Sequence, residues 1–453
     1  MSGNGQKEFV NYAWRAFLTQ MSITLIGALT VIATARLLGP AGKGRLTLLV
    51  MIPVLAVAFL HLGIGQATVF YAPRAAREPL VATSSAMVAA SGLLAVAIAL
   101  LLVLVMRGSL FRGIPASWLV FMCALIPVAL FYDLYAALFQ ALYRIPARNF
   151  LVLSCQAFNL LLFLLLAGAL KMGVRGGMIA WGLAYFIAVT IAVARMASMV
   201  TPERLRIDRG LGRALLGYGV RSCSGSLLNM LNTRFDFVLV AYFLAPAELG
   251  LFAVAVYAAE LLWKLPEAVA IVLQPRVAQL PEEEARRFTP RVLRLLLPPL
   301  MLAALLAAIF SAPFMRLLFG PAFSGAGPAM LILLPGFLAS AVGKVLASDL
   351  LARGRPLAYS ASSAIAFVAM VVLDIWLIPR LGIRGAAMAA TCAYGIGAAS
   401  MVVFYLRSTA MSLRDLFFPG PAGRGLLRDA GLVLRLLLPV GRREPPGTDR
   451  RYR

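Results

Sequence analysis

The chain has 453 residues, of which 62% are apolar and 13% are charged, and its mean hydropathy is +0.89. These values exclude a water-soluble globular protein and indicate a bundle of membrane-spanning helices. A net charge of +24 would suit nucleic acid. No nucleic-acid module accompanies it, so we expect anionic membrane lipids as partners and no nucleic acid. The four cysteines have neither disulfide nor metal spacing, and we expect no metal site or cofactor.

Long apolar runs follow one another along the chain. A helix needs about 20 apolar residues to cross a bilayer. Continuous runs of this length predict helices, since strands of a membrane barrel would alternate in polarity. The runs lie near residues 10–36, 45–71, 80–106, 116–140, 150–170, 176–198, 214–243, 250–275, 292–318, 325–350, 357–378 and 383–406. We therefore predict an all-α polytopic membrane protein with about 12 transmembrane helices.

Two stretches of the first half of the sequence recur in diverged form in the second half, which indicates an internal repeat. The stretch Ala35–Leu46 (ARLLGPAGKGRL) matches Ala241–Phe252 (AYFLAPAELGLF), with Pro40 and Pro246 206 residues apart. A second pair, GVRG at Gly173 and GIRG at Gly382, has an offset of 209. This offset spans six helices, an even number, so the halves form a parallel repeat about an axis along the membrane normal.

The repeat predicts a MATE-like arrangement of two six-helix lobes. We expect a first lobe at 1–198, a cytoplasmic linker at 199–213, a second lobe at 214–408, and a ligand path between the lobes. Lys and Arg are more than twice as frequent in the segments that would be cytoplasmic with the N-terminus inside as in the opposite loops, so both termini are expected in the cytoplasm. Lys43 and Arg45 are assigned to an extracytoplasmic loop.

The basic segment 409–453 is expected to be a cytoplasmic tail. Within it, Arg424, Arg428 and Arg435 share one helical face of residues 424–438, which are too short and too charged for a further span. This pattern predicts an amphipathic helix that lies on the inner leaflet.

Aligning the repeat makes Arg15 equivalent to Arg221, near the cytoplasmic ends of the first helix of each lobe. If these helices face the path between the lobes, the two arginines form a cationic entrance, because a guanidinium binds phosphate in a bidentate manner. In the alternative interpretation, both side chains extend to the lipid headgroups.

Charged residues also lie deeper in the spans, where they usually face a cavity or a partner. Arg234 precedes Pro246 by nearly the distance at which Glu260 follows it, so the two side chains are predicted to pair. In one hypothesis, cations bind an anionic substrate and acids couple protons or sodium. In the other, the groups neutralise each other and fix helix packing. The cations are Arg234, Lys264 and Lys344, and the remaining candidates are Asp236, Glu260, Glu267, Asp133 and His61, the only histidine.

Several motifs resemble the polysaccharide-biosynthesis, O-antigen (Wzx-like) flippases of the multidrug/oligosaccharidyl-lipid/polysaccharide exporter superfamily. The resemblance covers about residues 5–410, and it departs from the usual pattern at Lys43-Gly-Arg45. The matching motifs are Ala35–Arg45, Leu62–Gln66, Arg234-Phe-Asp236, Ala245–Ala255, Tyr257 and Gln274-Pro-Arg276.

The resemblance implies a flippase that moves a polyprenyl-diphosphate-linked oligosaccharide across the bacterial cytoplasmic (inner) membrane by alternating access of two lobes. It makes glycan polymerases and glycosyltransferases candidate partners. Two alternatives stay open: a cation-coupled multidrug exporter of the same fold, and a non-transporting membrane scaffold of a glycan-synthesis complex. An enzyme is not expected, since no loop carries a convergent carboxylate, histidine or metal constellation.

Overall fold

The computed structural model describes residues 3–418, with side chains from Thr19 onward except at Ser224 and Ser226. The predicted amphipathic helix at 424–438 lies outside the described residues, as does the side chain of Arg15. The first half contains α1 (Gly3–Leu60), α2 (Ile64–Tyr71), α3 (Arg77–Met106), α4 (Ala116–Ala124), α5 (Ile126–Ala141), α6 (Ile145–Phe163), the π-helical turn η1 (Leu164–Ala169) and α7 (Gly173–Ala197).

The second half is also helical throughout its described part. It contains η2 (Pro202–Arg204), α8 (Arg209–Phe243), α9 (Pro246–Glu260), η3 (Leu261–Trp263), α10 (Lys264–Val277), α11 (Glu282–Ile309), α12 (Ser311–Phe319), η4 (Pro321–Phe323), α13 (Ala326–Ala352), α14 (Pro356–Leu381), α15 (Ile383–Thr409) and α16 (Leu413–Phe417). The helix α8 begins at Arg209, inside the segment 199–213 that the sequence assigned to the linker.

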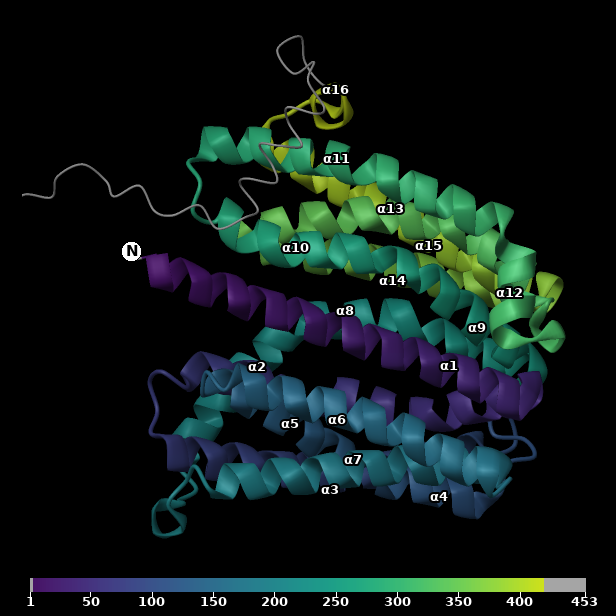
Figure 1. The fold of residues 1–453 in the computed structure, drawn as a ribbon, viewed down its shortest axis with the longest axis horizontal. Coiled ribbons are helices and arrows are strands. Elements are labelled where there is room, and N and C mark those ends of the chain that lie inside the picture. The colour runs from purple at the N-terminus through teal and green to yellow at the C-terminus, as the bar shows by residue number, and fades with distance from the viewer. Residues whose placement is uncertain (1–2, 419–453) are drawn as a thin grey trace, which may run out of the picture.

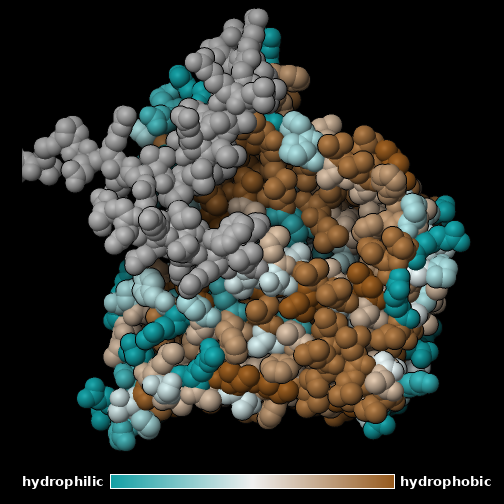
Figure 2. Space-filling model, in the orientation of Figure 1, coloured by the Kyte–Doolittle hydropathy of each residue, from teal (hydrophilic) through white to brown (hydrophobic). Residues whose placement is uncertain are grey.

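The chain is a multi-pass membrane protein. In the described part of the chain, ten helices are long and apolar enough to cross a membrane. One of these is a single 42-residue stretch, Thr19–Leu60, while α8 is not among the ten. The predicted count of twelve therefore stays a prediction. Apolar side chains cover much of the visible surface, and hydrophilic ones gather toward the two ends of the helices (Figure 2).

The long helix α1 is broken at Gly39, whose φ of 65° and ψ of 178° are not helical. Pro40 follows, and because proline lacks an N–H it suits the first position of a new helix. This corrects one expectation: Lys43 and Arg45 do not lie in a loop, because helix resumes directly after the break. The described helices form two groups, α2–α7 and α9–α15, with α1 and α8 running between them (Figure 1).

The two halves meet closely at the repeated Gly-Pro stretches. A Cβ added at Gly44 would overlap the carbonyl oxygen of Pro246, and a Cβ added at Gly250 would overlap the carbonyl oxygen of Pro40. Glycine is needed at both positions because any side chain would separate the backbones. A second close backbone contact joins Gly63, just before α2, to Gly219 of α8. These contacts hold α1 against α9 and the start of α2 against α8.

Candidate functional site: the cavity between the lobes

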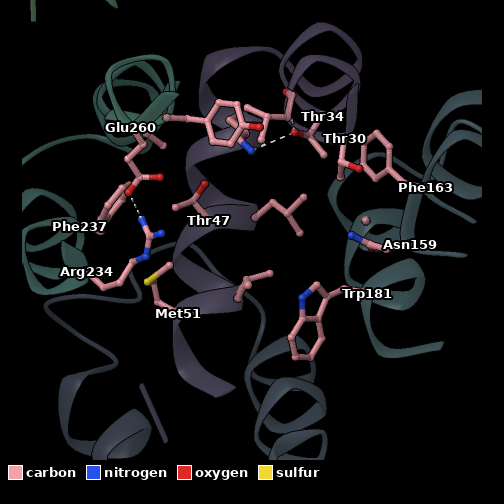
Figure 3. A pocket seen from close by; sticks show the side chains of 17 residues that line it. Thr30, Thr34, Thr47, Met51, Asn159, Phe163, Trp181, Arg234, Phe237 and Glu260 are labelled. Atoms are coloured by element: carbon pink, nitrogen blue, oxygen red, sulfur yellow. Dashed lines mark hydrogen bonds and ion pairs between the residues drawn. The ribbon is translucent and has the colours of Figure 1, made fainter. Parts of the chain in front are cut away.

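A cavity of about 290 Å³ lies between the two halves of the chain, bounded by α1, α6 and α7 on one side and by α8 and α9 on the other. Arg234 and Glu260 face Asn159 and Trp181 across it (Figure 3). The size is at the lower end of the range of small-molecule sites. The two sides differ in chemistry: the second-half side carries an ion pair, and the first-half side carries hydroxyl, amide and indole groups.

Lys43 is the cation that the sequence analysis did not place here. Its Nζ donates to Thr34 Oγ1 at 2.9 Å, across the break in α1. Among the described residues, no carboxylate lies within ion-pair distance of it. A cation without a counter-ion inside a membrane protein is costly unless it faces water or binds an anion. In the sequence, the departure from the family pattern at Lys43-Gly-Arg45 could have indicated a cavity residue. Because Lys43 was assigned to a loop, it was not among the predicted site residues.

Arg234 and Glu260 form the ion pair that their matching depths predicted. Arg234 Nη1 lies 2.9 Å from Glu260 Oε1, and 33% and 17% of the two side chains are exposed. The guanidinium also lies 5.8 Å from the centre of the Phe237 ring. With Lys43, the lining therefore carries two positive charges and one negative charge, an excess that suits an anionic ligand.

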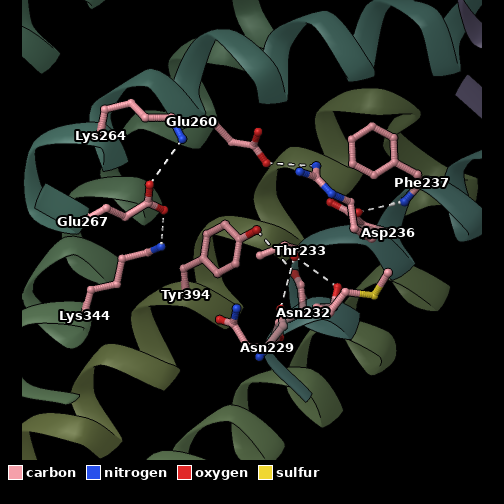
Figure 4. Close-up of polar contacts among 12 residues, drawn as sticks. Asn229, Asn232, Thr233, Asp236, Phe237, Glu260, Lys264, Glu267, Lys344 and Tyr394 are labelled. Carbon is pink, nitrogen blue, oxygen red and sulfur yellow. Dashed lines mark hydrogen bonds and ion pairs between the residues drawn. The ribbon is translucent and has the colours of Figure 1, made fainter. Parts of the chain in front are cut away.

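Lys264, Glu267 and Lys344 form a second charged group on α10 and α13. Glu267 accepts from Lys264 Nζ at 3.2 Å and from Lys344 Nζ at 2.9 Å (Figure 4). Lys344 also lies 4.1 Å above the ring of Trp263. These contacts favour the interpretation that the three residues satisfy one another, since one carboxylate serves both ammonium groups.

Asp236, two residues after Arg234 on α8, is much more deeply buried than Arg234. It is 1% exposed and accepts from the backbone N–H of Phe237 at 2.8 Å. On the neighbouring helix α14, Asp374 is fully buried, and neither carboxylate oxygen has a hydrogen-bond partner within the described structure. The sequence analysis missed Asp374, although it is the only acidic residue in the apolar run 357–378.

His61 and Asp133 lie together on the first-half side of a second cavity, of about 530 Å³. His61 Nε2 is 3.3 Å from Asp133 Oδ2, and the same nitrogen accepts from the backbone N–H of Gly65 at 3.2 Å. A neutral Nε2 can accept from Gly65, while a protonated Nε2 can only donate to Asp133.

Arg221 is exposed on α8, and its Nε donates to the carbonyl oxygen of Gly217 at 2.7 Å. Its repeat-related partner, Arg15, lies in the first part of α1. The symmetric cationic entrance thus stays a prediction.

Comparison with known proteins agrees with this architecture. A family model described as "Polysaccharide biosynthesis protein" matches residues 33–328, about two thirds of the chain. The "Probable low-salt glycan biosynthesis flippase Agl15" of Haloferax volcanii is 24% identical over 188 residues, which cover 41% of this chain and 40% of that protein. The match thus spans about two fifths of the relative's length.

Two solved structures share the fold. One is an inward-facing multidrug resistance MATE family transporter of the MOP superfamily, with a TM-score of 0.69 and 13% identity over 86% of this chain and 94% of that one. The other is the lipid II flippase MurJ in an inward closed conformation, with a TM-score of 0.72 and 11% identity over 93% and 97%. The chain therefore belongs to the polysaccharide biosynthesis protein family and has a MATE-like fold.

Proposed function

We propose that this protein is a flippase that moves a polyprenyl-diphosphate-linked glycan across the membrane through the cavity between its lobes. The observation that carries the proposal is Lys43, a cation in this cavity that pairs with a hydroxyl group and with no carboxylate of the described chain. A diphosphate is the anion that a lipid-linked glycan would present there. Membership of the polysaccharide biosynthesis family and the name of the Agl15 flippase support this substrate class.

Movement of the head group requires the lobes to open alternately to each side of the membrane. The fold shared with MATE and MurJ transporters supports this mechanism. The lipid tail would stay in the bilayer while the diphosphate moves past Lys43 and Arg234. Arg15 and Arg221 are proposed to receive it at the cytoplasmic entrance. Lys264 and Lys344 are the weaker candidates for substrate binding, because both pair with Glu267.

Coupling to protons or sodium is proposed at Asp236. Glu260 is already paired with Arg234, whereas Asp236 is buried and, within the described structure, accepts a hydrogen bond from the backbone N–H of Phe237. Asp374, buried on α14 without hydrogen bonds, is a second carboxylate of the same kind. Burial disfavours the charged form of a carboxylate, which favours the uptake of a proton or another small cation.

A multidrug exporter is the main alternative. Export of cationic drugs would need unpaired acidic residues in the cavity, and its one carboxylate, Glu260, is paired. A scaffold in a glycan-synthesis complex would not need a cation in the cavity.

The test uses the purified protein in vesicles, with a fluorescent short-chain polyprenyl-diphosphate glycan and a fluorescent cationic dye. Wild-type protein is expected to move the glycan lipid and not the dye. Lys43→Met should lower the affinity for the glycan lipid about 10–100-fold, because it removes a charge-assisted hydrogen bond. Lys171→Met, in an exposed turn, is the matched control. Unchanged affinity in Lys43→Met, or transport of the dye alone, would contradict the proposal.

The entrance pair has its own test. Arg15→Ala combined with Arg221→Ala should abolish glycan export at normal protein level. Unchanged export would remove the entrance from the proposal while leaving the role of Lys43 intact.

A further inference from the structure

The first-half side of the central cavity is polar without being acidic. Apart from Lys43, its polar lining residues are Thr30, Thr34, Thr47, Asn159 and Trp181. Thr30 and Thr34 donate to carbonyl oxygens of their own helix. The side chains of Thr47, Asn159 and Trp181 make no hydrogen bond within the described structure, and none of their polar atoms is among the fully buried unpaired ones, so they stay open to a ligand.

All three groups line the cavity, Asn159 and Trp181 on one side of α1 and Thr47 on the side of Arg234 (Figure 3). Thr47 comes from α1, Asn159 from α6 and Trp181 from α7, and the close-up shows Asn159 and Trp181 directed into the cavity (Figure 3). Trp181 is only 8% exposed and stacks on Tyr185 at 4.1 Å between ring centres. Its indole N–H is therefore held in place by packing. Unpaired polar groups at membrane depth must be satisfied by water or by a ligand.

The chemistry of this side selects a class of ligand. An amide donates and accepts at a fixed spacing, which matches two neighbouring hydroxyl groups of a sugar ring. The indole offers a donor beside an apolar face, and sugar rings have both polar edges and apolar faces. A lipid tail would leave all three polar groups unpaired. A cationic ligand would find Lys43 and no unpaired carboxylate among the lining residues.

We propose that Asn159 and Trp181 form a sugar-recognition site for the first sugar ring next to the diphosphate, with Thr47 at the border toward Arg234. The inference rests on the proposed function, since it takes the anion to be bound at Lys43. The cavity of about 290 Å³ has room for a single ring and its phosphates, so the remaining sugars of a longer glycan lie outside it. Recognition of charge and recognition of the sugar are then carried by different side chains.

The experiment measures equilibrium binding to the full chain in lipid nanodiscs with four probes. One probe is a short-chain polyprenyl diphosphate without sugar, and the others carry one glucose, one galactose or one N-acetylglucosamine. The wild-type protein should bind at least one of the three about tenfold more tightly than the bare lipid, the size of one to two hydrogen bonds. Asn159→Leu should abolish this preference and leave the affinity for the bare lipid within twofold. Trp181→Phe, which keeps an aromatic ring but removes the indole N–H, should reduce the preference about threefold.

Asn229→Leu is the matched control, because Asn229 lines a different cavity in the second half of the chain and should keep the full preference. If wild-type protein binds all four probes equally, the sugar site is wrong and the flippase proposal stands. If it binds none of them, the flippase proposal fails as well. A preference that survives unchanged in Asn159→Leu would also overturn the sugar site.

Discussion

The two sides of the central cavity derive from equivalent halves of one repeat, yet they carry different charges. On the first-half side, Lys43 is bonded to a hydroxyl group. On the second-half side, Arg234 is bonded to a carboxylate. At the offset of 206, Lys43 corresponds to Leu249, which is buried in the second half of the chain with 1% exposure. The duplication therefore preserved the backbone contact at Gly44 and Gly250 while the polar residues beside it diverged.

Single substitutions can therefore change either the backbone contact that the two halves share or the polar residues in which they differ. The largest expected effect comes from the shared backbone. Gly44→Val should lower glycan-lipid transport by at least tenfold, because its side chain would overlap the backbone of Pro246 and keep the lobes apart. Transport in vesicles is the measurement. Gly395→Ala, in open space on α15, should transport normally. Normal transport by Gly44→Val would show that the close contact is not required.

Moving the lysine from position 43 to its repeat-related position 249 tests directly whether the two halves differ. Combining Lys43→Leu with Leu249→Lys conserves the residues and moves the charge into a packed core position. An uncompensated buried charge costs about 3–5 kcal/mol, so thermal unfolding should occur at a clearly lower temperature than for Lys43→Leu alone. Equal unfolding temperatures would show that the two positions are equivalent after all.

Removing the acid from the second-half side makes the two sides more alike. Glu260→Gln leaves Arg234 without its partner, which should tighten binding of the bare polyprenyl diphosphate about tenfold through the added positive potential. The loss in unfolding free energy should be about 1 kcal/mol or less, because Arg234 is one-third exposed. Weaker binding in nanodiscs would mean that the ion pair itself holds the anion site together.

The smallest effect is expected within the second lobe. Lys264 and Glu267 are both nearly half exposed, so Lys264→Met should change the unfolding free energy by about 0.5 kcal/mol or less. Lys344→Met should be more damaging, since it also removes the contact with Trp263. Thermal unfolding of both variants in the same detergent measures the difference. A larger effect from Lys264→Met would reverse the order of the two contacts.

Much of the fold could be predicted from the sequence, because apolar runs and a repeat offset report directly on helices and their orientation. The Arg234–Glu260 pair could also be predicted, since rise per residue converts sequence distance from Pro246 into depth. Lys43 could not be placed, because a Gly-Pro step predicts a turn without saying how soon the helix resumes. Here it resumes at Pro40, which carries Lys43 into the span.

Asp374 shows a different limit. A single acidic residue in an apolar run predicts a buried carboxylate. Its partners depend on which helix packs beside it. Besides α15, which follows directly, α14 packs against α8, far away in the sequence. The proposed sugar-recognition residues were beyond sequence reasoning for the same reason, because Asn159 and Trp181 line one cavity only when α6 and α7 are packed beside α1.

The reciprocal contact of Gly44 with Pro246 and of Gly250 with Pro40 has the pattern of an isologous interface, the kind that joins two copies in a symmetric dimer. In such a dimer, every residue beside the axis occurs twice, so a lysine at this place would face its own copy. Joining the two halves in one chain removes that restriction. A fused chain can hold one lysine where a homodimer must hold two or none.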